Sequence, residues 1–276
     1  DGVIADFDAA EQMIKEFIKS IPSLQNRLWT PSLRMVICIP SGITEVEKRA
    51  VRDSAEISGA KEVYLIHEPM AAAIGMGIEV QEPRGNMIID IGGGTTEIAV
   101  LSLGGIVKDK SIKVAGDIFT SDIRYFMRQN HNLVIGERSA ERIKIEVGAA
   151  LENLEDTDKE IPENWAVQGR DQTTGVPKAV EVSYKEIARA LDASIKQIED
   201  AIMQALAMTP PELAADIYNS GIYLAGGGAM LRGLDDRIRN KTDLPVYVGE
   251  DPLRAVVRGT GIALKNIDQY DGVLMR

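Results

Sequence analysis

The sequence of 276 residues is poor in cysteine, in basic residues and in long apolar runs. Its single cysteine, Cys38, cannot form a disulfide within the chain, and it is interpreted as a small buried residue of a strand. No apolar run approaches the ~18 residues that a membrane-spanning helix needs. The formal net charge is −11, and no basic stripe is present to neutralise nucleic-acid phosphates. These absences argue against a disulfide framework, a transmembrane protein and a partner made of nucleic acid.

Two further signatures are missing. Neither G-x-x-x-x-G-K-[ST] nor G-x-G-x-x-G, the usual nucleotide fingerprints, occurs in the chain. His67 and His131 do not have the spacing of metal ligands, so both are interpreted as structural. The apolar content of 45% is nevertheless enough for a sizeable core and for about two domains.

What the chain does contain is a glycine-rich turn between two apolar runs that predict paired strands. It reads Asp90-Ile91-Gly92-Gly93-Gly94-Thr95-Thr96-Glu97. Three glycines allow backbone N–H groups to wrap an anion, the threonines add hydroxyl donors, and Asp90 can hold a hydrated cation. By itself, this pattern is equally consistent with a plain tight turn.

A second glycine-rich loop comes after another short apolar run. The run Ile222–Ala225 leads into Gly226-Gly227-Gly228 and then into a helix-like segment. Ligands often bind where a loop follows the carboxyl end of a strand. The two loops together predict a cleft.

Four motifs then resemble the actin/Hsp70/sugar-kinase ATPase superfamily and, within it, the MreB family of bacterial actins. They are HEPMAAAIG, DIGGGTTE, LAGGGAMLRGLD and DPLRAVVRGTGIAL, and the resemblance covers nearly the whole chain. It implies an α/β, actin-like two-lobed ATPase fold with RNase H-like domains. The family begins with a first phosphate hairpin, DxGTxNT, and a small subdomain, whereas this chain opens on a segment that resembles the part of the family fold after that subdomain. We therefore expect an N-terminally incomplete fold, with weak ATP binding and doubtful ATPase activity for the chain alone.

The resemblance also assigns roles to residues. ATP or ADP and Mg²⁺ are the implied cofactors, with Asp90 next to the metal ion through water. The implied catalytic residues are Glu68, which would orient the attacking water, Asp90 and Thr95. The implied phosphate-binding residues are Gly92, Gly93, Gly94, Thr95 and Thr96. The implied adenosine-binding residues are Gly226, Gly227, Gly228, Met230, Glu141 and Lys144.

Some of these roles have a plainer alternative. Without the resemblance, Glu68 is more simply a carboxylate at a helix N-terminus, where the helix dipole stabilises it. Glu141 and Lys144 are three residues apart on a predicted helix, which is also the spacing of an ordinary surface ion pair. Glu97 is equally consistent with a structural role. These alternatives stay open at this point.

A loop between Pro22 and Pro31 carries two adjacent apolar residues, Leu28 and Trp29, with Arg27 and Arg34 nearby. The resemblance places a membrane-insertion loop here. Trp favours the bilayer interface, and each arginine gains about 1 kcal/mol near anionic lipid. The alternative is a Trp that folds back onto its own core.

Hydrophobic periodicity predicts alternating helices and strands. Asp8 with Glu11, and Thr44 with Glu47, resemble capping boxes that open helices, and a long helix is expected from Ile187 to Leu206. We expect a first lobe, a second lobe and an inserted subdomain. Their predicted ranges are 1–83 with 250–276, 84–114 with 183–249, and 115–182.

The expected function is that of an ATP-dependent, membrane-associated filament subunit that organises bacterial cell shape and cell-wall elongation. The resemblance implies as partners further copies of the chain, an anionic membrane surface, a transmembrane cell-shape scaffold and wall-synthesis proteins, at the cytoplasmic face of the membrane. An Hsp70-type chaperone and a sugar or acetate kinase are the alternatives, because the superfamily shares the phosphate loop.

Overall fold

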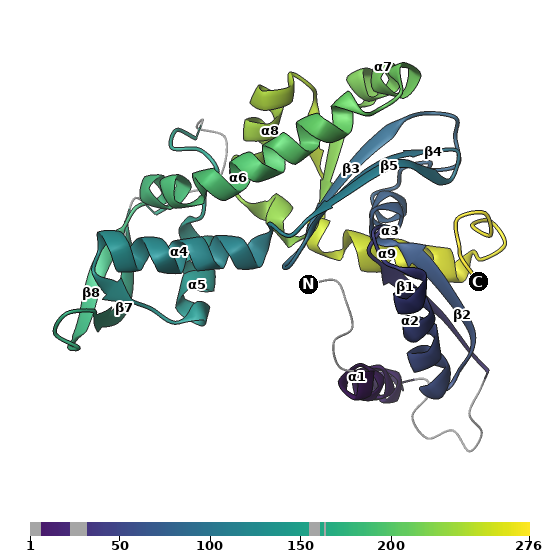
Figure 1. Ribbon diagram of the computed structural model, residues 1–276, viewed down its shortest axis with the longest axis horizontal. Helices are drawn as coiled ribbons and strands as arrows, with labels where there is room; N and C mark the ends of the chain where they lie inside the picture. Colours follow the sequence, from purple (N-terminus) through teal and green to yellow (C-terminus); the bar gives the residue numbers. More distant parts are fainter. Residues whose placement is uncertain (1–6, 23–31, 155–160, 163) are drawn as a thin grey trace.

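The computed structural model describes residues 7–22, 32–154, 161–162 and 164–276. Within these ranges the chain forms three β-sheets surrounded by helices (Figure 1). None of the helices in these ranges combines the length and the apolar character needed to span a bilayer. The predicted membrane loop, with Leu28 and Trp29, lies outside the described residues.

The first sheet consists of two parallel strands, with Ile39 opposite His67 at one end. As predicted, Thr44 and Glu47 form a capping box at the start of α2. The prediction for Asp8 was wrong: the first helix begins at Phe7, so Asp8 lies within its first turn and not at the N-cap. The elements here are α1 Phe7–Ser20, β1 Leu33–Ile39, α2 Glu45–Ile57, β2 Ala60–His67 and α3 Glu68–Gly75.

The second sheet has five strands in the order β10-β9-β3-β4-β5. It is assembled from two stretches, 86–112 and 222–248, which are far apart in the sequence. Strand β9 runs parallel to both β3 and β10, whereas β3, β4 and β5 are antiparallel neighbours. Its strands and the helices near it are β3 Asn86–Ile91, β4 Thr96–Ser102, β5 Gly105–Ile112, α6 Tyr184–Ala207, α7 Pro211–Ser220, β9 Ile222–Ala225, the 3₁₀ turn η2 Gly227–Met230, α8 Leu234–Thr242 and β10 Val246–Val248.

The third sheet lies within the segment that separates β5 from α6, at the far end of the molecule from β1 and β2 (Figure 1). Its three strands are antiparallel. The long helix predicted over 187–206 is confirmed as α6, which starts with a capping box formed by Ser183 and Glu186. The elements of this segment are α4 Gly116–Asn130, β6 Leu133–Val134, α5 Glu137–Val147, β7 Trp165–Asp171 and β8 Pro177–Val182.

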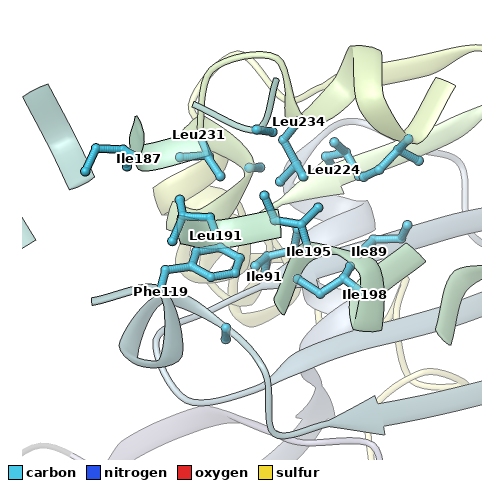
Figure 2. Close-up of a cluster of buried hydrophobic side chains, with 14 of the residues drawn as sticks. Ile89, Ile91, Phe119, Ile187, Leu191, Ile195, Ile198, Leu224, Leu231 and Leu234 are labelled. Atoms are coloured by element: carbon cyan, nitrogen blue, oxygen red, sulfur yellow. The ribbon is translucent and has the colours of Figure 1, made fainter. Parts of the chain in front are cut away.

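The largest apolar core fills the space between the five-stranded sheet and helices α4, α6 and α8. Figure 2 shows Ile89 and Ile91 of β3 close to Leu224 of β9, with α6 side chains packed over them. Strands β3 and β9 lead directly into the two glycine-rich loops. A polar substitution in this core would therefore destabilise the strands that position both loops.

A second core surrounds α3, whose residues from Pro69 to Gly75 are all buried. The remaining elements are the 3₁₀ turn η3 Pro252–Arg254 and helix α9 Ala255–Lys265, which packs against α3 and β1. Because α3 also contacts β3 and β4, it joins the two-stranded sheet to the five-stranded sheet.

Candidate functional site

The two glycine-rich loops meet at one edge of the five-stranded sheet. Strands β3 and β9 are parallel neighbours, and Asp90 lies opposite Ala225 at their ends. Gly226 has a φ of +81°, and a Cβ there would lie 2.4 Å from Asp90 Oδ1 and 2.3 Å from the Ile91 carbonyl oxygen. Only glycine fits this backbone conformation and this close approach. We call residues 90–97 and 226–230 the two-loop site.

The first loop is the predicted hairpin between β3 and β4, in which Asp90 pairs with Glu97 and Ile91 with Thr96. The Gly92 N–H donates to the Thr95 carbonyl oxygen at 3.0 Å and closes the turn. Thr95 is half-buried, and within the described ranges its hydroxyl makes no hydrogen bond. That hydroxyl is therefore free to donate to a bound group.

Thr96 has a different environment from the one predicted. Its side chain is fully buried, and its hydroxyl donates to the Val114 carbonyl oxygen at 2.7 Å. A hydroxyl has one hydrogen to donate, so this group has none left for a phosphate. In this structure the side chain of Thr96 therefore stabilises the hairpin, and its role in phosphate binding stays a prediction.

The start of α4 supports the same turn. The N–H groups of Gly116 and Asp117 donate to the carbonyl oxygens of Gly92 and Gly93, at 3.1 Å and 2.8 Å. With its carbonyl groups bonded in this way, the turn has a defined conformation. No local pattern identified this support, because more than twenty residues separate the partners in the sequence.

Glu141 and Lys144 form the ion pair that their spacing suggested, with Nζ and Oε2 2.7 Å apart. Lys144 also donates to the Gly116 carbonyl oxygen at 2.9 Å, and the Thr120 hydroxyl lies 2.7 Å from Glu141 Oε2. The pair is therefore attached to the residue that supports the glycine turn. Both explanations of these residues, ion pair and site residue, agree with this placement.

Two carboxyl groups at the site have raised pKa values. Burial raises the pKa of Glu68 to about 7, and the negative charges of Asp90 and Glu97 contribute to this rise. Burial, followed by the charge of Glu97, raises the pKa of Asp90 to about 6. The structure thus brings Glu68, at the start of α3, within electrostatic reach of Asp90 on β3.

The second loop leads into the turn η2, as the helix-like pattern after the glycines predicted. Met230, its last residue, is 62% exposed and can pack against a flat apolar group. Gly228 packs against Ile91, since a Cβ there would lie 2.2 Å from Ile91 Cγ2. The second loop is thus fitted closely onto the end of β3.

In chemical terms, the described part of the site combines backbone N–H groups of the glycine turn without a partner, the free Thr95 hydroxyl, the buried carboxyl group of Asp90 and the half-buried carboxyl group of Glu68. The N–H groups of a glycine turn suit an anion, and the carboxylates favour a cation beside it. Within the described ranges there is no group of three or more residues able to hold a metal ion by themselves. A cation here therefore requires oxygen atoms from its ligand or from water.

Sequence comparison places this chain among proteins of known role. The family described as MreB/Mbl protein matches residues 1–272. The chain is 48% identical over 274 residues to the cell shape-determining protein MreB of Escherichia coli K12, covering 99% of this chain and 77% of that protein. It is 45% identical over 269 residues to the cell shape-determining protein Mbl of Bacillus subtilis 168, covering 98% and 78%.

Structural comparison agrees. MreB5 of Spiroplasma citri bound to ADP matches with a TM-score of 0.89 at 37% identity, covering 98% of this chain and 78% of that one. The same protein bound to AMPPNP matches with a TM-score of 0.90. A MamK double helical filament, at 21% identity and a TM-score of 0.77, shares the fold. The predicted resemblance is therefore confirmed over the chaperone and kinase alternatives: the chain belongs to the MreB/Mbl family and has its actin-like α/β fold.

Proposed function

We propose that the two-loop site of this chain binds ATP or ADP and serves ATP hydrolysis in an actin-like filament that organises cell shape. The main support for the proposal is that the two glycine loops meet at the ends of β3 and β9, where Asp90 of the first loop lies close to Gly226 of the second. The ADP and AMPPNP bound to MreB5 support the choice of ligand, and the names of the MreB and Mbl relatives support the role in cell shape.

The first loop then binds the phosphates. The backbone N–H groups of Gly93, Gly94 and Thr95 donate to phosphate oxygens, and the free Thr95 hydroxyl adds one more donor. Glu68, on the neighbouring helix α3, orients the attacking water. In this role its raised pKa is useful, because a carboxylate that binds a proton near neutral pH is an effective general base.

The second loop and the Glu141–Lys144 pair then bind the nucleoside. Gly226, Gly227 and Gly228 allow the adenosine to lie against the backbone, and Met230 packs beside the base. Glu141 and Lys144 contact the ribose and the base from α5. Their attachment to Gly116 would link nucleoside binding to the conformation of the phosphate turn.

Magnesium fits this site as a companion of the nucleotide. Asp90 is 7% exposed, and its raised pKa means that a nearby positive charge would stabilise the ionised carboxylate. Mg²⁺ commonly binds through one carboxylate, several waters and substrate phosphates, which is the donor set that this site would offer. When bound, the ion would neutralise phosphate charge, while Asp90 would position it through water.

Measurement of turnover and binding tests the proposal. In the purified protein, Glu68→Gln should lower the rate of phosphate release by roughly 10²-fold or more, because the water loses its base, while a fluorescent nucleotide still binds. The matched control is Glu82→Gln, an exposed carboxylate in the loop before β3, which should change neither quantity. Unchanged turnover in Glu68→Gln would remove Glu68 from the mechanism.

The proposed partners are further copies of the chain, an anionic membrane surface at the cytoplasmic face, a transmembrane cell-shape scaffold and wall-synthesis proteins. The MamK filament structures support self-assembly by this fold. Electron microscopy with and without ATP is the direct test of filament formation.

A further inference from the structure

Glu97 carries a buried carboxylate without a cationic partner. It lies on β4, two residues after Thr95, and is only 1% exposed. Within the described ranges no lysine, arginine or histidine forms an ion pair with it. Burial of a carboxylate costs free energy unless hydrogen-bond donors compensate for the lost water.

Two serines supply those donors. The Ser41 hydroxyl donates to Glu97 Oε2 at 2.5 Å, and the Ser41 N–H approaches the same oxygen at 3.3 Å. The Ser111 hydroxyl donates to the other carboxylate oxygen, Oε1, at 2.6 Å. Both oxygens of the carboxylate are thus satisfied.

The two serines belong to different sheets. Ser111 lies on β5, directly opposite Glu97 in the five-stranded sheet. Ser41 lies in the turn between β1 and α2, and so moves with the two-stranded sheet. In Figure 1, these sheets form separate parts of the molecule that are joined through α3 and α9. Glu97 therefore makes a side-chain connection between them, in addition to the packing of those helices.

We propose that Ser41 and Glu97 form a closure contact, which holds the two-stranded sheet against the five-stranded sheet at the two-loop site. This proposal rests on the proposed nucleotide binding and names Glu97 as a positioning residue for it. Separation of the sheets would remove two hydrogen bonds from a buried carboxylate, so the contact favours the closed arrangement. Because Glu97 pairs with Asp90 across the hairpin, movement of Ser41 would also be transmitted to the phosphate turn.

Electrostatic coupling supports this position for Glu97. Its negative charge raises the pKa of both Glu68 and Asp90, so the carboxylate lies close to the groups with proposed chemical roles. A shift of Glu97 would therefore change the environment of both.

Two matched serine variants distinguish a contact that holds the two sheets together from a hydrogen bond that only stabilises one sheet. Ser41→Ala and Ser111→Ala each remove one hydroxyl from the same carboxylate, but only Ser41 belongs to the other sheet. Spin labels at Asp53→Cys on α2 and Lys241→Cys on α8, both exposed positions, in a Cys38→Ala background, report the distance between the two parts by pulsed electron paramagnetic resonance. The release rate of a fluorescent nucleotide is measured in parallel.

We expect Ser41→Ala to lengthen and broaden the distance distribution and to speed nucleotide release about tenfold, equivalent to ~1.4 kcal/mol. Ser111→Ala should change both much less than Ser41→Ala, because it leaves the bond between the two sheets in place, and Ser41→Thr, which keeps a hydroxyl, should restore both. If Ser41→Ala does not fold, Ser41→Gly provides the same comparison.

An unchanged distance in Ser41→Ala, or equal changes in the two alanine variants, would overturn the proposal. The distance is also recorded without nucleotide. A parent protein that binds no nucleotide would therefore refute the proposed function, while the distances would still decide whether the closure contact exists.

Discussion

At the residue scale, the two-loop site is defined by carboxyl groups that are difficult to ionise. The pKa of Glu68 rises from its usual value near 4.5 to about 7, chiefly because the group is buried. In the unfolded chain Glu68 loses its proton near pH 4.5, whereas in the folded protein it keeps the proton until about pH 7. The unfolded state thus binds fewer protons in this interval, so the contribution of Glu68 to stability falls as pH rises.

We therefore predict that Glu68→Gln stabilises the protein above pH 7 but not at pH 5. Glutamine retains the size and polarity of the side chain without the charge that burial opposes. Differential scanning calorimetry in EDTA, without nucleotide, should show a Tm about 2–4 °C higher than that of the parent at pH 8, and no difference at pH 5. Glu82→Gln, on an exposed loop, serves as the control with no pH-dependent difference. The same Tm shift at both pH values would contradict the assigned pKa.

At the scale of elements, the crossing of α3 and α9 depends on two glycines. A Cβ on Gly75 would lie 1.9 Å from the Ala255 carbonyl oxygen, and one on Gly259 would lie 1.8 Å from the Ala71 carbonyl oxygen. Backbone atoms cannot move away as a flexible side chain would, so the helices pack this closely only with glycine at both positions. Since α3 joins the two sheets, this crossing determines how α9 and the two-stranded sheet are attached.

A pair of alanine substitutions on α9 tests this packing. Gly259→Ala should destabilise the protein by about 1–3 kcal/mol, because the new methyl group forces the helices apart. Gly261→Ala, two residues away with nothing within 4 Å of its Cβ, should stabilise it by about 0.5–1 kcal/mol through helix propensity. Urea denaturation measures both. Equal effects of the two substitutions would mean that the crossing tolerates a side chain.

At the scale of the whole molecule, the net charge acts against the proposed membrane binding. The net charge of −11 repels anionic lipid, so the proposed attraction has to come from a local part of the surface. Arg34, one of the two arginines near Leu28 and Trp29, forms an ion pair with Glu62 at 3.1 Å. The charge of Arg34 is thus partly compensated by Glu62. We therefore propose that Leu28 and Trp29, rather than the arginines, supply most of the binding to the membrane.

We predict that the double substitution Leu28→Ser with Trp29→Ser abolishes co-sedimentation with anionic liposomes without weakening nucleotide binding. The matched control replaces two exposed residues elsewhere, Leu103→Ser with Tyr218→Ser, and should pellet like the parent. Because the anchor is mainly apolar, raising salt should weaken pelleting only slightly. Equal pelleting of the Leu28/Trp29 variant and the parent would place Trp29 in the core of the protein.

Features governed by neighbours in sequence could be predicted from the chain alone. The glycine hairpin, the capping box of α2 and the end of α6 before Pro210 depend on local conformation and periodicity. The motifs also sufficed for the family and the fold. Even here, the exact start of α1 was missed, because Asp8 suits the first turn of a helix as well as its N-cap.

Other features arose only from contacts between distant segments. The Thr96 hydroxyl donates to the Val114 carbonyl oxygen, and Lys144 of the Glu141–Lys144 pair donates to the Gly116 carbonyl oxygen. Ser41 donates to Glu97, which lies 56 positions away in the sequence. The raised pKa values of Glu68 and Asp90 likewise require burial and charges from separate strands and helices. Residue type and spacing determine which groups a segment offers, whereas the packing of β3, β4, β9 and α3 decides which of them remain free for a ligand.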